Sequence, residues 1–277
     1  MATRSVVGNC RLCGATAVEL RDSHIIPKWA YRRVRDSTGT IGAPDPIQIA
    51  DGVAVQTSTQ LKEYMLCGGC ELRLCRDEDY VSKLAVRDDG THGLLESLPA
   101  GAVFATGPQV HETPPLRAAS ISHLDRAAIA RFAASIFWRA HASRTHRFNE
   151  LRLWSAQGEA LRRFLLGDRL PPTMCLSLFV PVDGIDLKSV HWPVVSTPGT
   201  GRKGDNSAHG FLIAGLFFNL TTGSLSVPQE CLECGEAPHA IIAHWRSIPF
   251  IVNTAGMALA AEPKGKGARA ARRRPKK

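Results

Sequence analysis

Three short stretches near the N-terminus decide the fold that we expect of this chain: Cys10-Arg11-Leu12-Cys13, Asp22-Ser23-His24-Ile25-Ile26-Pro27-Lys28 and Leu66-Cys67-Gly68-Gly69-Cys70-Glu71. A turn with two cysteines two residues apart directs both thiols to one point, and two such pairs complete a closed tetrahedral site for structural zinc. The 53 residues between Cys13 and Cys67 exceed the spacing of a compact zinc finger, so the intervening chain must hold structure of its own. We predict one zinc ion bound by Cys10, Cys13, Cys67 and Cys70.

The alternative for these four cysteines is disulfide bonds or unrelated core thiols. The chain begins Met1-Ala2-Thr3-Arg4 with no apolar run behind it, so we expect a cytoplasmic, reducing environment, in which disulfides are rare. A further pair, Cys231 and Cys234, is followed by His239 and His244 and raises the question of a second zinc. We favour surface thiols or an incidental turn there, because a strand over 240–244 would send alternate side chains to opposite faces.

The composition is that of an ordinary soluble protein of 277 residues, with 44% hydrophobic and 21% charged residues. No apolar run approaches the roughly 20 residues that span a bilayer, so no membrane is expected as a partner. Residues 263–277 hold eight lysines and arginines and no acid, which leaves the rest of the chain near +1 of the total net charge of +9. We expect residues 256–277 to form a disordered basic tail that contacts phosphates through Arg272, Arg273 and Arg274, or that serves only solubility.

Hydrophobic periodicity predicts the remaining elements. Strands are expected over 15–21, 101–105, 174–182, 189–195, 211–220 and 240–252, and a hairpin over 47–55. Helices are expected over 28–35, 71–86, 125–142, capped near Ser122 or His123, and 149–166. We expect most arginines of the last two helices to lie on solvated faces.

The helix over 71–86 carries two acids on the same stripe as its apolar residues Leu74, Cys75, Val81 and Ala85. Glu71 and Glu78 are seven residues apart, so both face the buried side. A carboxylate on that side needs a metal, a base or a hydrogen-bond donor as its partner. For Glu78 the plainer interpretation is an ion pair with Lys28 or an arginine, and for Cys75 a small core residue.

The ordered set of motifs resembles the HNH nuclease family, a ββα-metal group built on a treble-clef zinc scaffold. The residues that carry the resemblance are the pair Cys10 and Cys13, then Ser23-His24-Ile25-Ile26-Pro27, then Leu66-Cys67-x2-Cys70-Glu71 opening a helix. It covers about residues 8–86. The resemblance implies that His24 is a general base for phosphodiester hydrolysis, with Mg²⁺ or Mn²⁺ held by oxygen ligands and zinc only structural.

The sequence departs from the family pattern at two positions. Ser23 stands where the family has a metal-binding Asp, and Glu71 stands where His or Asn is usual, although Glu is itself a good ligand for a hard cation. The family's Asn that orients the histidine has no clear equivalent. The catalytic set is therefore His24, Glu71 and, in a supporting role, Glu78, with Lys28 contacting nucleic acid. The alternative is a degenerate site in a zinc-stabilised nucleic-acid-binding or adaptor protein.

For architecture we predict an α+β protein. An HNH-like zinc module over 1–90 is followed by an irregular linker over 91–121. A helical pair and a mostly antiparallel sheet occupy 122–255, and the basic tail follows. The expected partner is nucleic acid, with DNA favoured over RNA. Residues 122–255 carry no recognisable catalytic set and are the expected surface for a protein partner or a second copy of the chain.

Overall fold

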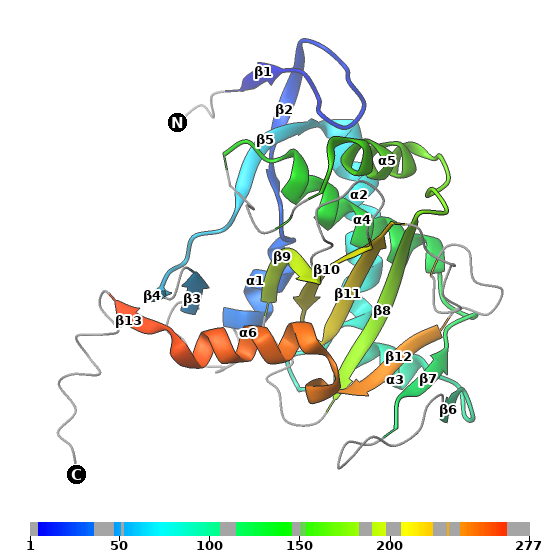
Figure 1. Cartoon of the computed structure of the whole chain (residues 1–277). Coiled ribbons are helices and arrows are strands. Elements are labelled where there is room, and N and C mark those ends of the chain that lie inside the picture. Colours follow the sequence, from blue (N-terminus) through cyan, green and yellow to red (C-terminus); the bar gives the residue numbers. More distant parts are fainter. Residues whose placement is uncertain are drawn as a thin grey trace.

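A computed structural model describes residues 5–35, 47–50, 53–105, 115–145, 151, 153–182, 190–197, 206–223, 232 and 239–264. The chain is a mixed α+β protein, as expected, and its described residues form three sheets (Figure 1). No helix in the described part of the chain is long and apolar enough to cross a membrane.

The N-terminal elements form a three-stranded antiparallel sheet of order β1-β2-β5, made of β1 (Val6–Gly8), β2 (Val18–His24) and β5 (Lys62–Cys67). The first cysteine pair lies in the turn between β1 and β2. Helix α1 (Lys28–Arg35) follows Pro27, and α2 (Gly68–Leu84) begins directly at the end of β5. The predicted strand, basic helix and strand-to-helix junction are all present. Cys75 is exposed, so its assignment to the core is wrong. The buried face of α2 includes Leu74, Asp77 and Val81.

Helix α4 (Arg126–Ala142) is the most buried helix, with both Phe132 and Phe137 inaccessible to solvent. It begins at Asp125, whose side chain accepts a hydrogen bond from the N–H of Ala128, and not at Ser122 or His123. Helix α5 (Ser155–Leu166) begins six residues later than predicted and ends at Gly167, whose φ of 121° only glycine adopts readily.

The large sheet has seven strands in the order β6-β7-β12-β8-β11-β10-β9, with only β12 and β8 parallel. Its strands are β6 (Val103–Ala105), β7 (Arg117–Ser120), β8 (Met174–Val182), β9 (Val190–Thr197), β10 (Ser207–Ile213), β11 (Leu216–Thr222) and β12 (His239–His244). Within the segment 91–121, the strand expected over 101–105 is present as β6, whereas α3 (Gly93–Ser97) and β7 were not predicted.

The expected single strand over 211–220 is wrong: it is a hairpin. Ala214 and Gly215 form a two-residue turn with φ of 42° and 81°, and Phe211 pairs with Phe218 across the two strands. Gly215 has no room for a side chain, because a Cβ there would lie 2.5 Å from Cγ2 of Val86. The hairpin tip therefore packs directly against the chain that follows α2.

The expected strand over 240–252 is also only partly correct. β12 ends at His244, a short 3₁₀ turn (Trp245–Ser247) follows, and α6 (Pro249–Ala260) begins at a proline. β13 (Glu262–Lys264) then pairs with β4 (Val53–Gln56), which forms the predicted hairpin with β3 (Ile47–Ala50). The expectation of a tail disordered from residue 256 is therefore wrong as far as Lys264; residues 265–277 lie outside the described part.

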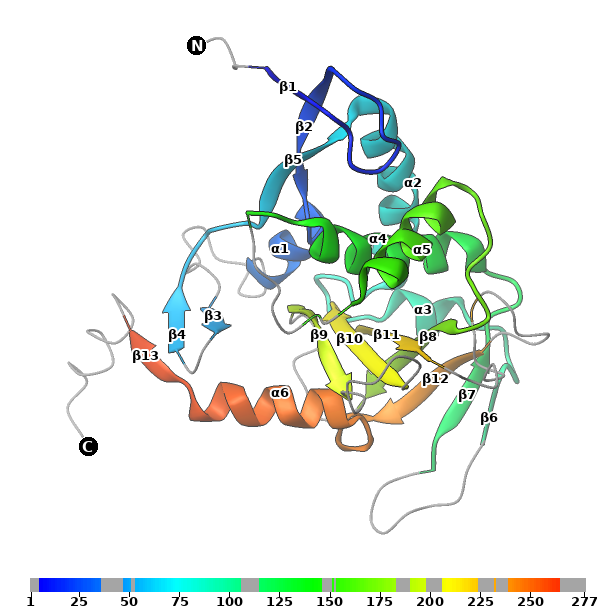
Figure 2. The ribbon, with the colours of Figure 1, turned by 45° about the horizontal axis from the view of Figure 1, so that its top comes forward.

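Helices α2, α4 and α5 lie between the β1-β2-β5 sheet and the seven-stranded sheet. Helix α6 covers the opposite face of the seven-stranded sheet (Figure 2). One hydrophobic cluster runs from Cys10 and Leu12 of the first turn through Phe137 to Ile242 of β12. The expected modules 1–90 and 122–255 thus share a core. A second cluster, around Phe217 and Phe250, lies beneath α6.

A histidine of the large sheet is buried on the side of α4. His209 of β10 is 1% exposed, and neither ring nitrogen has a hydrogen-bond partner in the described part of the chain. The hydroxyl of Thr222, on the adjacent strand β11, is buried without a partner in the same part of the chain. Burial lowers the pKa of His209 to about 4, because the charged imidazolium would lose its hydration at this position.

Candidate metal centre and histidine site

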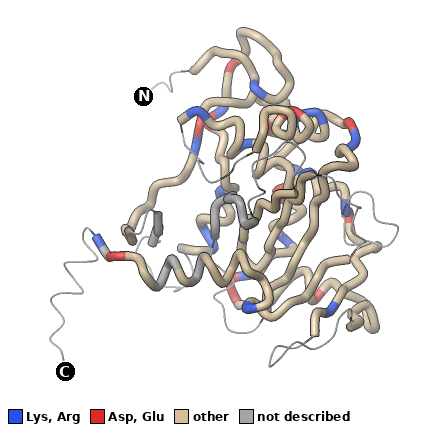
Figure 3. The backbone as a smooth tube through the Cα atoms, in the orientation of Figure 1, with Lys and Arg blue, Asp and Glu red and all other residues tan. Residues whose placement is uncertain are grey.

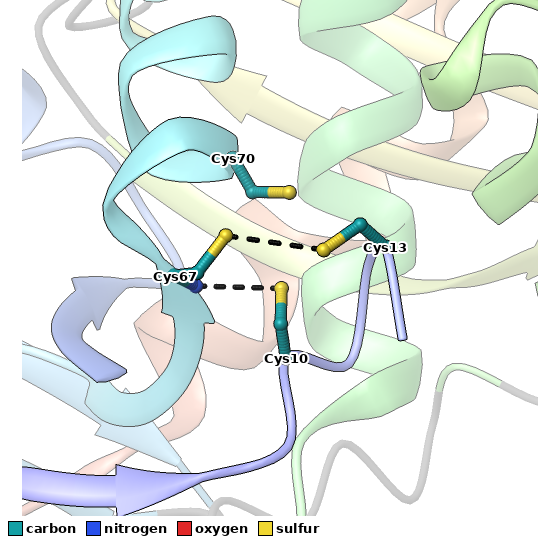
Figure 4. A group of neighbouring side chains, drawn as sticks. All are labelled: Cys10, Cys13, Cys67 and Cys70. Atoms are coloured by element: carbon teal, nitrogen blue, oxygen red, sulfur yellow. Dashed lines mark hydrogen bonds between the residues drawn. The ribbon is translucent and has the colours of Figure 1, made fainter. Parts of the chain in front are cut away.

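The two cysteine pairs meet in space at the junction of β5 and α2 (Figure 4). Cys67 is the N-cap of α2 and Cys70 lies in its first turn, while Cys10 and Cys13 come from the turn after β1. The four Sγ atoms all lie within 4.8 Å of one another, and those of Cys13 and Cys67 are 3.9 Å apart. That distance is too long for a disulfide of about 2.05 Å. It is close to the roughly 3.8 Å edge of a tetrahedron with 2.3 Å metal–sulfur bonds.

The backbone around the cluster favours thiolates. The N–H of Cys67 donates to Sγ of Cys10 at 3.3 Å. Burial raises the pKa of the Cys10 thiol, but the N–H of Cys67 at the end of β5 and N–H groups of the first turn outweigh it and lower the pKa to about 7. Burial and the neighbouring thiols of Cys13 and Cys67 raise the pKa of Cys70. Cys10 thus deprotonates easily, whereas Cys70 resists becoming a second anion beside it. A bound dication would balance the negative charge and allow the neighbouring thiols to deprotonate as well.

Arginines tie the first cysteine turn to the helices behind it. Arg11 donates to the carbonyl of Ala142 at 2.8 Å and forms an ion pair with Glu63 at 2.6 Å, and Arg162 of α5 donates to the carbonyl of Leu12. Glu63 is 7% exposed and also accepts from Ser143. Burial acts to raise the pKa of Glu63, but these donors outweigh it and lower the pKa.

His24 ends β2 on the face opposite to Ser23, as strand alternation requires. Its ring is half-buried beside Tyr31 of α1, with ring centroids 6.5 Å apart. Nε2 of His24 lies 2.7 Å from Oε1 of Gln60. With the oxygen of the Gln60 amide facing the ring, Nε2 is the nitrogen that carries the proton in this contact, and Nδ1 is then the basic nitrogen.

Ser23 near the end of β2 and Glu71 in the first turn of α2 are in contact. The Oγ of buried Ser23 donates to Oε2 of Glu71 at 2.6 Å. The carboxylate thus has a hydrogen-bond partner from the protein itself, which is one of the outcomes expected for an acid on this face.

Glu78 has an arginine as its partner. NH1 of Arg139 on α4 donates to Oε1 of Glu78 at 2.6 Å and to the carbonyl of His24 at 3.0 Å. This arginine is 1% exposed, and Arg131 forms a two-bond ion pair with buried Asp77. We expected most arginines of the two helices on solvated faces. Arg139 is a buried exception, and Arg131, which is 35% exposed, also pairs with α2.

Among the described residues, only the four cysteines form a group of three or more metal-ligating side chains. His24, Glu71 and Glu78 each have a separate partner and form no such group. Lys28 is exposed at the start of α1, four residues beyond His24. Acidic and basic positions are interspersed over the N-terminal elements around it (Figure 3). Arg272, Arg273 and Arg274 lie outside the described residues, as do Cys231 and Cys234 of the possible second zinc site.

An open hollow of about 720 Å³ lies beside the first cysteine turn. Its lining comes from Asn9 to Arg11, from Tyr64, from the end of α4 and from the start of α5. None of His24, Glu71 and Glu78 lines it, so it is separate from the histidine site.

Sequence reasoning missed two residues of the histidine site, Gln60 and Arg139. Gln60 lies in a polar segment with no periodicity, and only the pairing of His24 with Lys62 brings it near the ring. Arg139 did carry a signal: it is seven residues after Phe132 and three after Ile136, on the apolar stripe of its helix.

No family model, no curated protein and no solved structure matches this chain. The HNH resemblance therefore rests on the sequence motifs alone.

Proposed function

We propose that the protein is a metal-dependent endonuclease that hydrolyses phosphodiester bonds of nucleic acid, with DNA favoured, and that His24 is its general base. The observation that carries this proposal is the 2.7 Å contact between Nε2 of His24 and Oε1 of Gln60. A base held by a second side chain is the arrangement that proton abstraction needs, because one nitrogen is fixed and the other is free for a water molecule.

In this proposal the four-cysteine site holds zinc, and the zinc is structural. A cysteine turn, a pair of strands and a helix that begins at the second cysteine pair are the parts of a treble clef. A closed set of four thiolates leaves no open position for a substrate. Its role is then to hold the end of β5 and the start of α2 in place beside β2, which carries His24.

Glu71 is the residue that would hold a divalent cation such as Mg²⁺ or Mn²⁺. Its Oε2 accepts a hydrogen bond from Ser23 at 2.6 Å, so Oε1 is the oxygen that would face the ion. Water and phosphate oxygens would complete the shell, as is usual for Mg²⁺. The ion would supply charge stabilisation for the phosphate and the leaving oxygen. Lys28 and the basic tail would contact flanking phosphates.

A second candidate is a zinc-stabilised protein that binds nucleic acid without cutting it. The observation that favours it is that Glu71 and Glu78 already have hydrogen-bond partners within the protein, Ser23 and Arg139. This candidate predicts salt-dependent binding that is lost when residues 263–277 are removed.

A plasmid-nicking assay with Mg²⁺ or Mn²⁺ separates the two candidates. Wild type should cut, and His24→Ala should lose about 10²- to 10⁴-fold in rate while keeping one zinc per chain. His123→Ala, which removes an exposed histidine outside the site, is the matched control and should cut like wild type. Cutting by His24→Ala at the wild-type rate would refute the assigned base. Salt-sensitive binding with no cutting by zinc-loaded wild type would establish the second candidate.

A further inference from the structure

Arg139 joins three elements at one nitrogen atom. It lies on α4 with 1% of its surface exposed, and its NH1 donates to Oε1 of Glu78 on α2 and to the carbonyl of His24 at the end of β2. Arg139 comes from the part of the chain in which the sequence shows no catalytic set.

The contact with the carbonyl fixes the peptide that follows His24. The N–H of Ile25 donates to the carbonyl of Leu61 at 2.9 Å, so both polar groups of the His24–Ile25 peptide are held. Ile25 itself is fully buried. The direction of a side chain follows from its backbone, and the outer ring nitrogen of His24 is held by Gln60. The imidazole is thus constrained at both ends.

Glu78 keeps Arg139 in this position. A guanidinium at this depth without a counter-charge would be strongly unfavourable, and the 2.6 Å ion pair supplies that charge. Glu78 therefore acts on the histidine site through Arg139, and no metal is needed to account for its half-buried position.

We propose that Arg139, supported by Glu78, is a positioning residue that sets where the imidazole of His24 lies. The catalytic consequence rests on the proposed function, but the placement of the ring can be measured without any activity. The competing interpretation is a buried ion pair that only stabilises the packing of α4 on α2.

The chain provides a matched control for that interpretation. Arg131 lies two turns earlier on α4 and pairs with Asp77 of α2 through two hydrogen bonds of 2.8 and 3.0 Å. It joins the same two helices through an arginine–carboxylate pair, although its side chain is 35% exposed against 1% for Arg139. Both Arg139→Met and Arg131→Met should therefore lower the stability, the buried Arg139 by more, and only Arg139→Met should alter His24.

The experiment compares the two variants with wild type by two readouts. The first is the NMR titration of the His24 ring, assigned by the signals that vanish in His24→Ala. We expect its chemical shifts and titration midpoint to change in Arg139→Met and to stay as in wild type in Arg131→Met. The second is plasmid cleavage, where Arg139→Met should lower kcat about 10- to 100-fold with a smaller change in KM, as for a base displaced by about 1 Å.

His24 signals that coincide in Arg139→Met and wild type would overturn the inference, and so would equal losses of kcat in the two arginine variants. A wild type that does not cut refutes the proposed function alone, because the titration still decides the placement of the ring. If Arg139→Met does not fold, Glu78→Gln replaces it. That variant keeps the shape and removes the counter-charge, and an unchanged His24 titration in it would also overturn the inference.

Discussion

His209 should make the stability of the protein depend on pH. Its pKa is about 4 in the folded chain against an ordinary value of 6.5, so the unfolded chain binds the proton more tightly. The contribution is complete above about pH 7.5 and is lost as the pH falls through 6.5 towards 4. Linkage gives a loss of about 2 kcal/mol at pH 5 and about 3 kcal/mol at pH 4.

The assay is urea unfolding at pH 7.5 and at pH 5, on wild type and on His209→Leu. Leucine cannot bind a proton, so wild type should lose about 2 kcal/mol more than the variant between these two values. Acid release of metal from the cysteine site affects both proteins and cancels in the comparison. Exposed His123→Gln is the control and should behave as wild type. Equal losses in wild type and His209→Leu would show that the buried imidazole is not held neutral by its surroundings.

Two further outcomes follow from the geometry. Stripping the metal with a strong chelator should release one zinc per chain and expose the amides around the ligands Cys10, Cys13, Cys67 and Cys70 to hydrogen exchange. Strands β8 and β11 should stay protected, and a chain that binds no zinc and keeps full protection would contradict the proposed site. Gly215→Ala should cost about 2–4 kcal/mol in urea unfolding, because φ is 81° and the new Cβ would meet Val86. Gly101→Ala, with φ of 79° but open space, should cost only about 1 kcal/mol, and equal costs would rule out the crowding at the hairpin tip.

Local spacing was enough to predict the cysteine cluster and its order along the chain. A Cys-x2-Cys turn brings its own sulfurs together, and the start of α2 directly after Cys67 follows from the apolar pattern on either side. The helix α4 was predicted on the same basis. The position of Glu78 on the apolar stripe of its helix also predicted that it needs a partner. That partner, Arg139, lies on the apolar stripe of another helix.

The sequence-based errors have two sources: turn or helix-start residues inside apolar runs, and strand pairing between segments that are far apart in the sequence. Ala214-Gly215 interrupts an otherwise continuous apolar run with a tight turn, and Pro249 opens a helix because its φ suits a first helical position. β7 is short, and it becomes a strand by pairing with β6 and with β12, which lies more than a hundred residues later in the chain. No local signal distinguishes such a segment from a loop.

The shared core has a consequence for the order in which the protein is made. Both cysteine pairs leave the ribosome before any residue of α4 or α5, yet Arg11 and Leu12 complete their hydrogen bonds only with Ala142 and Arg162. At about 5–20 residues per second, several seconds pass after the four cysteines are synthesised before α4 and α5 are synthesised. Early binding of a metal ion would hold the first turn beside α2 during that interval. It would also protect the thiols from oxidation and from non-native disulfides until α4 and α5 are synthesised.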